Sequence, residues 1–544
     1  MFNKIFTIST LMLACICAVA QQMSADEPIY LKTDRSNYIS GDDLLFCIYL
    51  YDGTINDTVP GTDVYIDITD IGNQFITGTI AKQSNGVASG LLNLPDSLST
   101  AYYKVRAYTR YPNIDNYYSI KEVFVSNRFG KATAQLAKSR TDTARHTSTE
   151  HIISIDKTEY RTREKVHMTL SYPEYAKTMV RIVSKKQWQE ETEPTIGKCD
   201  ALKIEEGYTP LTPYNGIIVT GTVTDTASGK PIPNAIVMVS LQDSVVRLRY
   251  DITDSTGSFC ILLYNYLGTQ QIFINAFNYL YEPYLNAKIE LKSQHDLVIT
   301  DHNVTPAYAE TDSIELNKSI INKAFEIQQF APIGIADRPD NTYDRFMVGT
   351  LRQVVNTEDF VEFENFREIV RETMPFVRIR KDNNGQTELR IVDERGIVKS
   401  RPLLLVDGVP LSNIDLLMDK GSSKIKRIDT QNAPRNFGNL NFSNGIVLVW
   451  THALDFWQGC NAPGTFEFYV QNYQQPIATA NKPETGDKVP NLQQVIYWNP
   501  NIDINGQIDL DATLSDENGD FVIDLFGIDN NGKYLRDFRL INVK

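Results

Sequence analysis

Short apolar runs separated by turn residues dominate residues 21–127, and this pattern predicts antiparallel β-structure. The intervening Gly, Asp, Asn and Pro residues favour tight turns between the strands. We therefore predict a β-sandwich over residues 21–127. Residues 128–150 change to small, polar and basic side chains, which are typical of a linker. The apolar runs are LLFCIYLY, DVYIDITDI, QFITGTIA, YYKVRAYT and EVFVSN.

A phrase near the start of this sandwich returns later in the chain. TDRSNYISGDDLLF at residues 33–46 corresponds to IDKTEYRTREKVHM at residues 155–168, which indicates a second, related module over residues 151–213. Only a few strands follow the second phrase before turn-rich sequence begins, too few to close a sandwich. This module is therefore either truncated or completed by strands after residue 280, such as NAKIELK and HDLVITD. The matched positions are Asp34 and Asp156, Arg35 and Lys157, Tyr38 and Tyr160, and Asp42 and Glu164.

A small β-domain is predicted over residues 214–300, in which DSTG at residues 254–257 closes a hairpin. Residues 301–340 are predicted to form a helical connector. The apolar residues of TDSIELNKSIINKAFEIQQF recur at helical spacing in this connector, after Thr311 or Asp312 as the cap.

The remaining sequence predicts one mixed unit and one further β-unit. Residues 341–452 combine a helix in FREIVRETMPFVRI, which should end before Pro375, with strands in RPLLLVDGVPL and GIVLVW. An α+β domain is expected there. Residues 453–544 return to alternating strands with Asn-Gly turns and predict a C-terminal β-sandwich. The predicted fold class is therefore mainly β, with several β-sandwich domains and one small α+β domain.

The N-terminus predicts export. Residues 1–20, MFNKIFTISTLMLACICAVA, combine one lysine, an apolar stretch and a small-residue ending, as secretory signal peptides do. Lipidation of Cys15 is the alternative, although the residues that follow it stay apolar. No later apolar run reaches the ~18 residues that a membrane helix needs. The later cysteines are too few and too widely spread for a disulfide framework, so buried free thiols are expected. They are Cys47, Cys199, Cys260 and Cys460.

The net charge of −14 argues against nucleic acid as a partner, because phosphate binding requires a basic face. HTSTEH at residues 146–151 lacks the His spacing of a zinc site, and the acidic turns lack a full calcium loop. GIDNNGKY at residues 527–534 lacks the Ser or Thr of a phosphate-binding loop and predicts a hairpin. Trp450, Trp457 and Trp498 are expected in the core rather than on a stacking platform. We predict no catalytic residue, no metal site and no cofactor.

Several stretches resemble known families. YLKTDRSNYISGDDLLFCIYL and the phrase at residue 155 resemble macroglobulin-type domains of bacterial α2-macroglobulin-like proteins, although the Cys-Gly-Glu-Gln thioester is absent. Residues 217–262 are similar to carboxypeptidase regulatory-like domains, which are non-catalytic β-sandwiches. Residues 361–451, with PLLLVDGVPL around Asp407 and Gly408, resemble the plug domain of TonB-dependent outer-membrane receptors. This combination of domains resembles a family of exported proteins of Bacteroidetes.

The resemblances imply a non-enzymatic interaction or scaffold protein of the cell envelope, in the periplasm or at the outer-membrane surface. The expected partner is an envelope protein, either an outer-membrane barrel or a component of a secretion complex. Two alternatives remain open. One is a macroglobulin-like defence protein that meets proteases, with residues 128–150 as its cleavable segment, and the other is a glycan-binding surface protein. The plug-like domain alone is not a transporter, because too little chain follows it for a receptor barrel.

Overall fold

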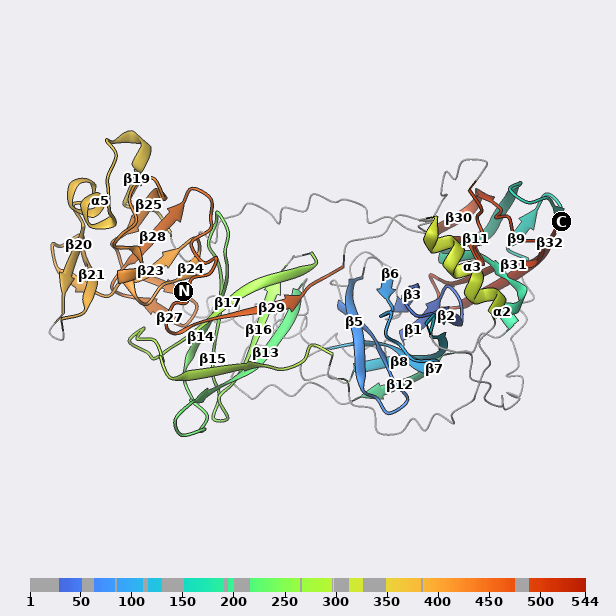
Figure 1. The fold of residues 1–544 in the computed structure, drawn as a ribbon, viewed down its shortest axis with the longest axis horizontal. Coiled ribbons are helices and arrows are strands. Elements are labelled where there is room, and N and C mark those ends of the chain that lie inside the picture. Colours follow the sequence, from blue (N-terminus) through green and yellow to red (C-terminus); the bar gives the residue numbers. More distant parts are fainter. Residues whose placement is uncertain are drawn as a thin grey trace, which may run out of the picture.

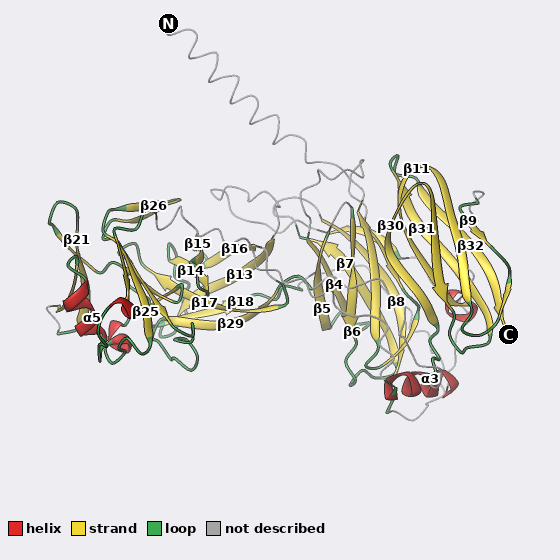
Figure 2. Ribbon diagram, turned by 90° about the horizontal axis from the view of Figure 1, so that it is seen from above, coloured by secondary structure: helices red, strands yellow, loops and turns green. Residues whose placement is uncertain are grey.

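Four bodies lie in a row in the computed structural model (Figures 1 and 2). The predicted fold class is confirmed, because the molecule is mainly β with several sandwich-like bodies. From one end to the other we name the bodies the α+β domain (349–462), the central sandwich (216–297 and 465–474), the N-terminal sandwich (29–129 and 195–199) and the split module (151–189 and 489–544).

The structure describes residues 29–50, 63–83, 86–110, 116–129, 151–189, 194–199, 216–264, 267–295, 297, 313–325, 349–382, 385–474 and 489–544. The predicted signal peptide, with Cys15, and nearly all of the predicted linker lie outside these residues. Within the described ranges, no helix is long and apolar enough to cross a membrane.

Two antiparallel sheets form the N-terminal sandwich, because alternate apolar residues of their strands face one shared core. One sheet has the order β1-β3-β6, and the other has the order β12-β8-β7-β4-β5 with β2 paired in parallel to β8. The edge strand β12 comes from a later part of the chain. The strands are β1 (Ile29–Thr33), β2 (Asn37–Ile39), β3 (Asp43–Leu50), β4 (Asp63–Thr69), β5 (Phe75–Lys82), β6 (Val87–Asn93), β7 (Ala101–Thr109), β8 (Asn116–Ser126) and β12 (Thr195–Cys199).

The split module is built from two segments that are far apart in the sequence. Its strands have the order β10-β32-β31-β11-β30, and β9 pairs with β11. β11 and β30 pair from Lys165 with Thr513 to Val183 with Val495, and bulges bend both strands on the way. The elements are β9 (Ile153–Ile155), β10 (Glu159–Tyr160), β11 (Lys165–Ser184), α2 (Lys185–Gln189), β30 (Val495–Thr513), β31 (Gly519–Asp529) and β32 (Tyr534–Val543).

The strands that complete this module are not the predicted ones. NAKIELK forms β18 (Ala287–Leu291), which pairs with β13 (Gly216–Asp225) of the central sandwich, and HDLVITD lies largely outside the described residues. Strands after residue 280 do complete the module, as predicted, but the prediction that NAKIELK is one of them is wrong. A separate sandwich at residues 453–544 is wrong too, because β29 (Thr465–Gln471) joins the central sandwich while β30 to β32 join β11. Local periodicity identifies strands, whereas the tertiary fold selects their partners.

The central sandwich consists of two sheets with the orders β16-β13-β18 and β15-β14-β17-β29. Its core is continuous with apolar residues of the N-terminal sandwich, including Tyr65, Ile80 and Tyr108. The two sandwiches therefore share one buried cluster. The remaining strands are β14 (Ile236–Leu241), β15 (Arg247–Ile252), β16 (Ser258–Tyr264) and β17 (Thr269–Phe277).

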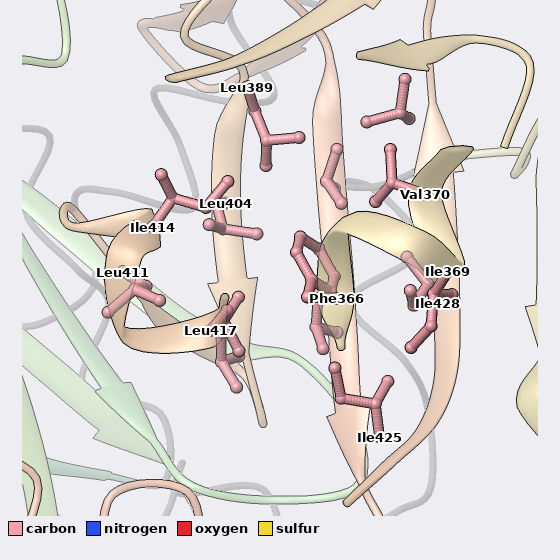
Figure 3. Packing of buried hydrophobic residues seen from close by; sticks show 14 of the residues in the cluster. Phe366, Ile369, Val370, Leu389, Leu404, Leu411, Ile414, Leu417, Ile425 and Ile428 are labelled. Carbon is pink, nitrogen blue, oxygen red and sulfur yellow. The ribbon is translucent and has the colours of Figure 1, made fainter. Parts of the chain in front are cut away.

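The α+β domain packs one helix, α5 (Phe366–Thr373), between a five-stranded and a three-stranded sheet. Asn365 caps α5 by accepting a hydrogen bond from Glu368 N (2.9 Å), and the helix ends before Pro375 as predicted. Figure 3 shows Phe366, Ile369 and Val370 of α5 in the apolar core beside Ile425 and Ile428. The sheets have the orders β19-β25-β28-β23-β24 and β20-β21-β22, and β26 pairs with β27.

The elements of this domain are β19 (Gln353–Asn356), η1 (Thr357–Asp359), β20 (Val377–Lys381), β21 (Thr387–Val392), β22 (Val398–Ser400), β23 (Leu403–Val406), β24 (Val409–Pro410), η2 (Ile414–Leu417), β25 (Ile425–Gln431), β26 (Arg435–Phe437), β27 (Leu440–Phe442) and β28 (Ile446–Thr451). A further helix, α3 (Ser313–Ala324), lies where the connector helix is predicted. It contacts both the split module and the N-terminal sandwich through polar groups, since Lys318 pairs with Glu517 (2.8 Å) and Ser319 Oγ donates to Asp42 Oδ1 (3.1 Å).

A chain that ends at residue 488 should lose the folded split module, because β11 would have neither β30 nor β31 beside it. Hydrogen exchange followed by mass spectrometry should show that the amides of residues 165–184 lose protection. The amides of β14 and β17 in the central sandwich should stay protected and serve as the internal control. Retained protection over residues 165–184 would contradict the dependence of β11 on the distant strands.

Candidate functional site

The repeated phrase folds into a compact turn, which is buried in the N-terminal sandwich. Tyr38 Oη donates a hydrogen bond to Asp34 Oδ1 (2.7 Å), and the Arg35 guanidinium lies 4.7 Å from the centroid of the Tyr38 ring. Arg35 Nη2 also pairs with Asp42 Oδ2 at 2.9 Å. Burial raises the pKa of Asp34. The four matched side chains therefore bind one another and fix the chain where it enters β3.

The split module contains the same turn at its surface. Tyr160 Oη donates to Asp156 Oδ1 (2.5 Å), and Lys157 pairs with Glu164 while its Nζ lies 4.9 Å from the Tyr160 ring centroid. Here the hydrogen bond from Tyr160 lowers the pKa of Asp156, the opposite direction to that of Asp34. Each turn contains a short strand that pairs in parallel with a later strand of its module, β2 with β8 and β10 with β32.

The junction between the N-terminal sandwich and the split module buries the first turn. Arg181 Nη1 donates to the carbonyl oxygens of Thr33 and Asp34 at 2.7 and 3.0 Å. Its Nη2 pairs with Asp524 Oδ2 at 2.8 Å, which compensates the buried charge. The apolar part of this junction comprises Leu45, Cys47, Tyr49, Val87, Met179, Val183, Val495, Trp498, Phe526 and Ile528.

β11, the strand after the second turn, carries polar side chains on its outer side. His167 Nδ1 lies 2.5 Å from Asp511 Oδ1, and Thr169 Oγ1 donates to Asp509 Oδ1 at 2.6 Å. These positions correspond to the apolar residues of β3 that enter the junction. The correspondence, read from the two phrases, is Leu45 with His167, Cys47 with Thr169 and Tyr49 with Ser171.

A network of four buried polar side chains lies at the junction between the N-terminal and central sandwiches. Arg106 forms two hydrogen bonds to Asp67, Nε to Oδ1 at 2.6 Å and Nη2 to Oδ2 at 2.7 Å. Tyr108 Oη donates to Asp67 Oδ2 (3.1 Å) and lies 3.3 Å from His295 Nδ1. Burial acts to raise the pKa of Asp67, but the hydrogen bonds from His295 and Arg106 outweigh it and lower that pKa.

This network positions the segment that follows β18. Arg106 Nη1 donates to Leu297 O at 3.0 Å, and the His295 ring stacks on Phe75 with 5.1 Å between ring centroids. A Cβ at Gly78 would lie 2.6 Å from the His295 ring, so only glycine leaves room for it. Although an Asp, a His and a Tyr meet here, they are buried and make structural contacts across the junction.

A second carboxyl group lies at the same junction. Tyr473, which follows β29, donates a hydrogen bond from its hydroxyl to Asp63 of β4. Burial raises the pKa of Asp63 to about 7. Gln471 Nε2 donates to Gly78 O at 2.9 Å, so the end of β29 is attached to the N-terminal sandwich by side chains and backbone together.

The junction between the central sandwich and the α+β domain is formed by the turn in PLLLVDGVPL. Asp407 is fully buried and accepts hydrogen bonds from Thr451 N and Thr451 Oγ1, both at 2.7 Å. Burial raises its pKa. Gly408 adopts a φ of +83°, and a Cβ there would lie 3.1 Å from Leu241 O of the central sandwich. The glycine therefore allows the two bodies to approach closely.

The three tryptophans singled out in the sequence lie in the core, as expected. Trp450, Trp457 and Trp498 are 6%, 1% and 1% exposed, so they form no stacking platform. GIDNNGKY is a hairpin turn between β31 and β32, as predicted, and Asp529 N donates to Lys533 O within it (3.0 Å).

The cysteines and the stretch HTSTEH are the remaining candidates for thiol or metal chemistry. Cys47, Cys260 and Cys460 are free thiols, and burial raises the pKa of Cys47 and of Cys260 to about 12, so these two stay protonated. Of HTSTEH, only His151 lies within the described residues. Within that part of the chain, His, Cys, Asp and Glu side chains form no group of three or more that could hold a metal ion.

Comparisons with known proteins give only distant likenesses. No family model and no curated protein matches the chain. Trypsin-activated α2-macroglobulin from Escherichia coli is 8% identical over 95% of this chain and 41% of that chain, with a TM-score of 0.25. Salmonella α2-macroglobulin reacted with methylamine is 9% identical over 95% and 39% of the two chains, with a TM-score of 0.24.

A tetra-tandem repeat from the extending region of a large adhesion protein is also similar. It is 9% identical, covers 95% of this chain and 99% of that chain, and has a TM-score of 0.16. The chain spans about two fifths of the length of the α2-macroglobulins that it matches. TM-scores this low carry no argument about activity or partners, which must come from the geometry of the junctions and surfaces.

The pH dependence of stability should report on Asp63. Because burial raises its pKa from 3.8 to about 7, the folded state favours the protonated carboxyl. This contribution to stability is complete below about pH 4 and is lost as the pH rises through about 7. Asp63→Asn should therefore raise the melting temperature at about pH 8 by about 2–4 °C and change it less at about pH 5.

Thermal unfolding followed by circular dichroism measures this effect. Asp509→Asn, on the exposed side of β30, is the matched control for exchanging a carboxylate for an amide. Equal pH profiles for the wild type and Asp63→Asn would show that Asp63 does not titrate in this range.

Proposed function

We propose that this protein is a non-enzymatic scaffold of the cell envelope that holds its α+β domain in a fixed position for an envelope protein partner. The supporting observation is that apolar clusters cross all three junctions between the four bodies. Relative motion of neighbouring domains is the usual expectation unless their interface is large and apolar. A row of bodies joined in this way acts as a spacer rather than as a hinged enzyme.

The buried charged groups support the same function. Arg106, paired with Asp67, donates across one junction to Leu297 O, and Arg181, paired with Asp524, donates across another to Thr33 O and Asp34 O. At the third junction, the backbone carbonyl of Asp407 accepts a hydrogen bond from Asp243 N of the central sandwich (3.2 Å). The predicted signal peptide and the resemblance to exported envelope proteins favour the periplasm or the outer-membrane surface as the location of this scaffold. The second hypothesis from the sequence is a protein that interacts with proteases. Its expected cleavable segment, residues 128–150, lies almost entirely outside the described residues.

The fixed position of the α+β domain can be tested at Gly408. Gly408→Val should loosen the junction, because the side chain meets Leu241 O and a valine is strained at a φ of +83°. Small-angle X-ray scattering should then show a larger radius of gyration and a broader distance distribution. Gly385→Val is the control, because Gly385 has a φ of +82° but a Cβ there would have no atom within 4 Å. Identical scattering from the two variants would contradict a Gly408-dependent junction.

The partner can be tested by mild cross-linking of the tagged protein in its native envelope, followed by mass spectrometry. Reproducible capture of one outer-membrane barrel or one secretion component, lost in Gly408→Val and kept in Gly385→Val, is the expected result. Capture of proteases alone would overturn the scaffold proposal in favour of the protease-interacting hypothesis. Capture that does not depend on Gly408 would show that the position of the α+β domain is unimportant.

A further inference from the structure

The three-stranded sheet of the α+β domain has one buried and one exposed face. Val377 and Ile379 of β20 face the core around α5, together with Leu389 and Ile391 of β21. Because side chains alternate along a strand, the residues between them point outward. We call this outward surface the cationic face. It consists of Phe376, Arg378, Arg380, Glu388, Arg390, Val392, Val398 and Ser400.

The strand register gathers like charges on the cationic face. Arg378 lies directly opposite Arg390, and Ser400 of β22 follows in the same row. Like charges in directly opposite positions destabilise a sheet. Two acids lie on this side of the sheet. Glu388 is bound to Arg390 (2.6 Å) with Arg401 beyond it at 3.8 Å, and Asp382 lies 3.7 Å from Arg401. The face therefore keeps a positive charge in a chain whose net charge is −14.

Two of its arginines remain available. The side chains of Arg378 and Arg380 are exposed, and no ion pair to either is present among the described residues. Arg380 Nη1 donates only to the carbonyl of its neighbour Ile379 (3.2 Å). An anionic partner would relieve the repulsion between Arg378 and Arg390 without first breaking another ion pair.

The same face has an apolar row, and among the described residues no further strand pairs with β22. Val392 lies opposite Val398 and donates its N–H to Phe376 O (2.8 Å), so the three side chains form a row. Val398 is 50% exposed, and the Arg352 guanidinium lies 5.5 Å from the Phe376 ring centroid. Arg401 N donates to Leu389 O (3.0 Å), so alternate residues of β22 bond to β21, and the N–H and C=O groups of Val398 and Ser400 point away from it. Apolar side chains beside arginines are typical of protein interfaces, which favours a protein over a polysaccharide as the occupant.

We propose that the cationic face binds an acidic, extended segment of a protein partner, which lies across the three strands from β20 to β22. Its carboxylates would pair with Arg378 and Arg380, and its apolar residues would pack along Phe376, Val392 and Val398. The inference rests on the proposed interaction role and names the chemistry of the contact.

Binding can be measured by fluorescence anisotropy with the full-length protein and a labelled synthetic peptide that alternates Glu with Val. The peptide should bind, and binding should weaken as the ionic strength rises from ~0.05 M to ~0.5 M. The double variant R378E/R380E should weaken binding at least about tenfold, because like charges then face each other. Arg371→Glu, an exposed charge reversal on α5 outside the face, should change it by less than about twofold.

Val398→Asp tests the apolar row separately. Val398 is half exposed, so the domain should fold, but the substitution removes an apolar contact and places a like charge beside the acidic peptide, so binding should weaken at least about tenfold. Circular dichroism verifies the fold of each variant. Unchanged binding in Val398→Asp, or equal binding of a peptide with Lys in place of Glu, would overturn the proposal.

A sulfated polysaccharide is the competing ligand in the same assay. Its binding in place of the peptide, with the same loss in R378E/R380E, would overturn the protein partner in favour of a polyanion. The proposed scaffold function is tested independently of this inference. If the peptide does not bind but cross-linking still captures one envelope partner in a Gly408-dependent way, this inference is wrong and the scaffold proposal stands.

Discussion

The pairing of β11 with β30 is the interaction on which the rest of the structure depends. It joins residues 165–183 to residues 495–513, so the central sandwich and the α+β domain are both contained in one closed loop of chain. The entropic cost of closing a loop grows only slowly with its length, which makes so long an insertion tolerable. Pairing between strands this far apart in the sequence is intrinsically slow.

The closed loop explains why the junctions are so well packed. The chain passes between bodies several times. Each segment that enters another body is bonded to it, as β12 pairs with β8 and Tyr473 donates a hydrogen bond to Asp63. Buried ion pairs add little stability compared with apolar contacts, but a charge left without its partner is costly. Arg106 donates to Leu297 O and Arg181 donates to Thr33 O, so separating the bodies would leave these buried guanidinium groups with fewer hydrogen-bond partners.

Much of the fold could be predicted from the sequence, because strand alternation, helix caps and turn residues act locally. The end of α5 before Pro375 and the hairpin at GIDNNGKY are examples. The strand partners could not be predicted, since β18 and β30 have equally good strand patterns and only the tertiary fold distinguishes them. The cationic face could be predicted only in part. The alternation in VRIRK indicates exposed arginines, but the register that places Arg378 opposite Arg390 comes from the structure.

The difference between the two copies of the repeated phrase has a consequence for how the row of bodies can grow. In stacked repeat proteins, inner units expose apolar faces to a neighbour, and terminal units carry polar outer faces that stop the stack. Leu45, Cys47 and Tyr49 give the N-terminal sandwich an inner face, whereas His167, Thr169 and Ser171 give the split module a terminal one. The split module thus presents a polar outer face of the kind that terminal units carry.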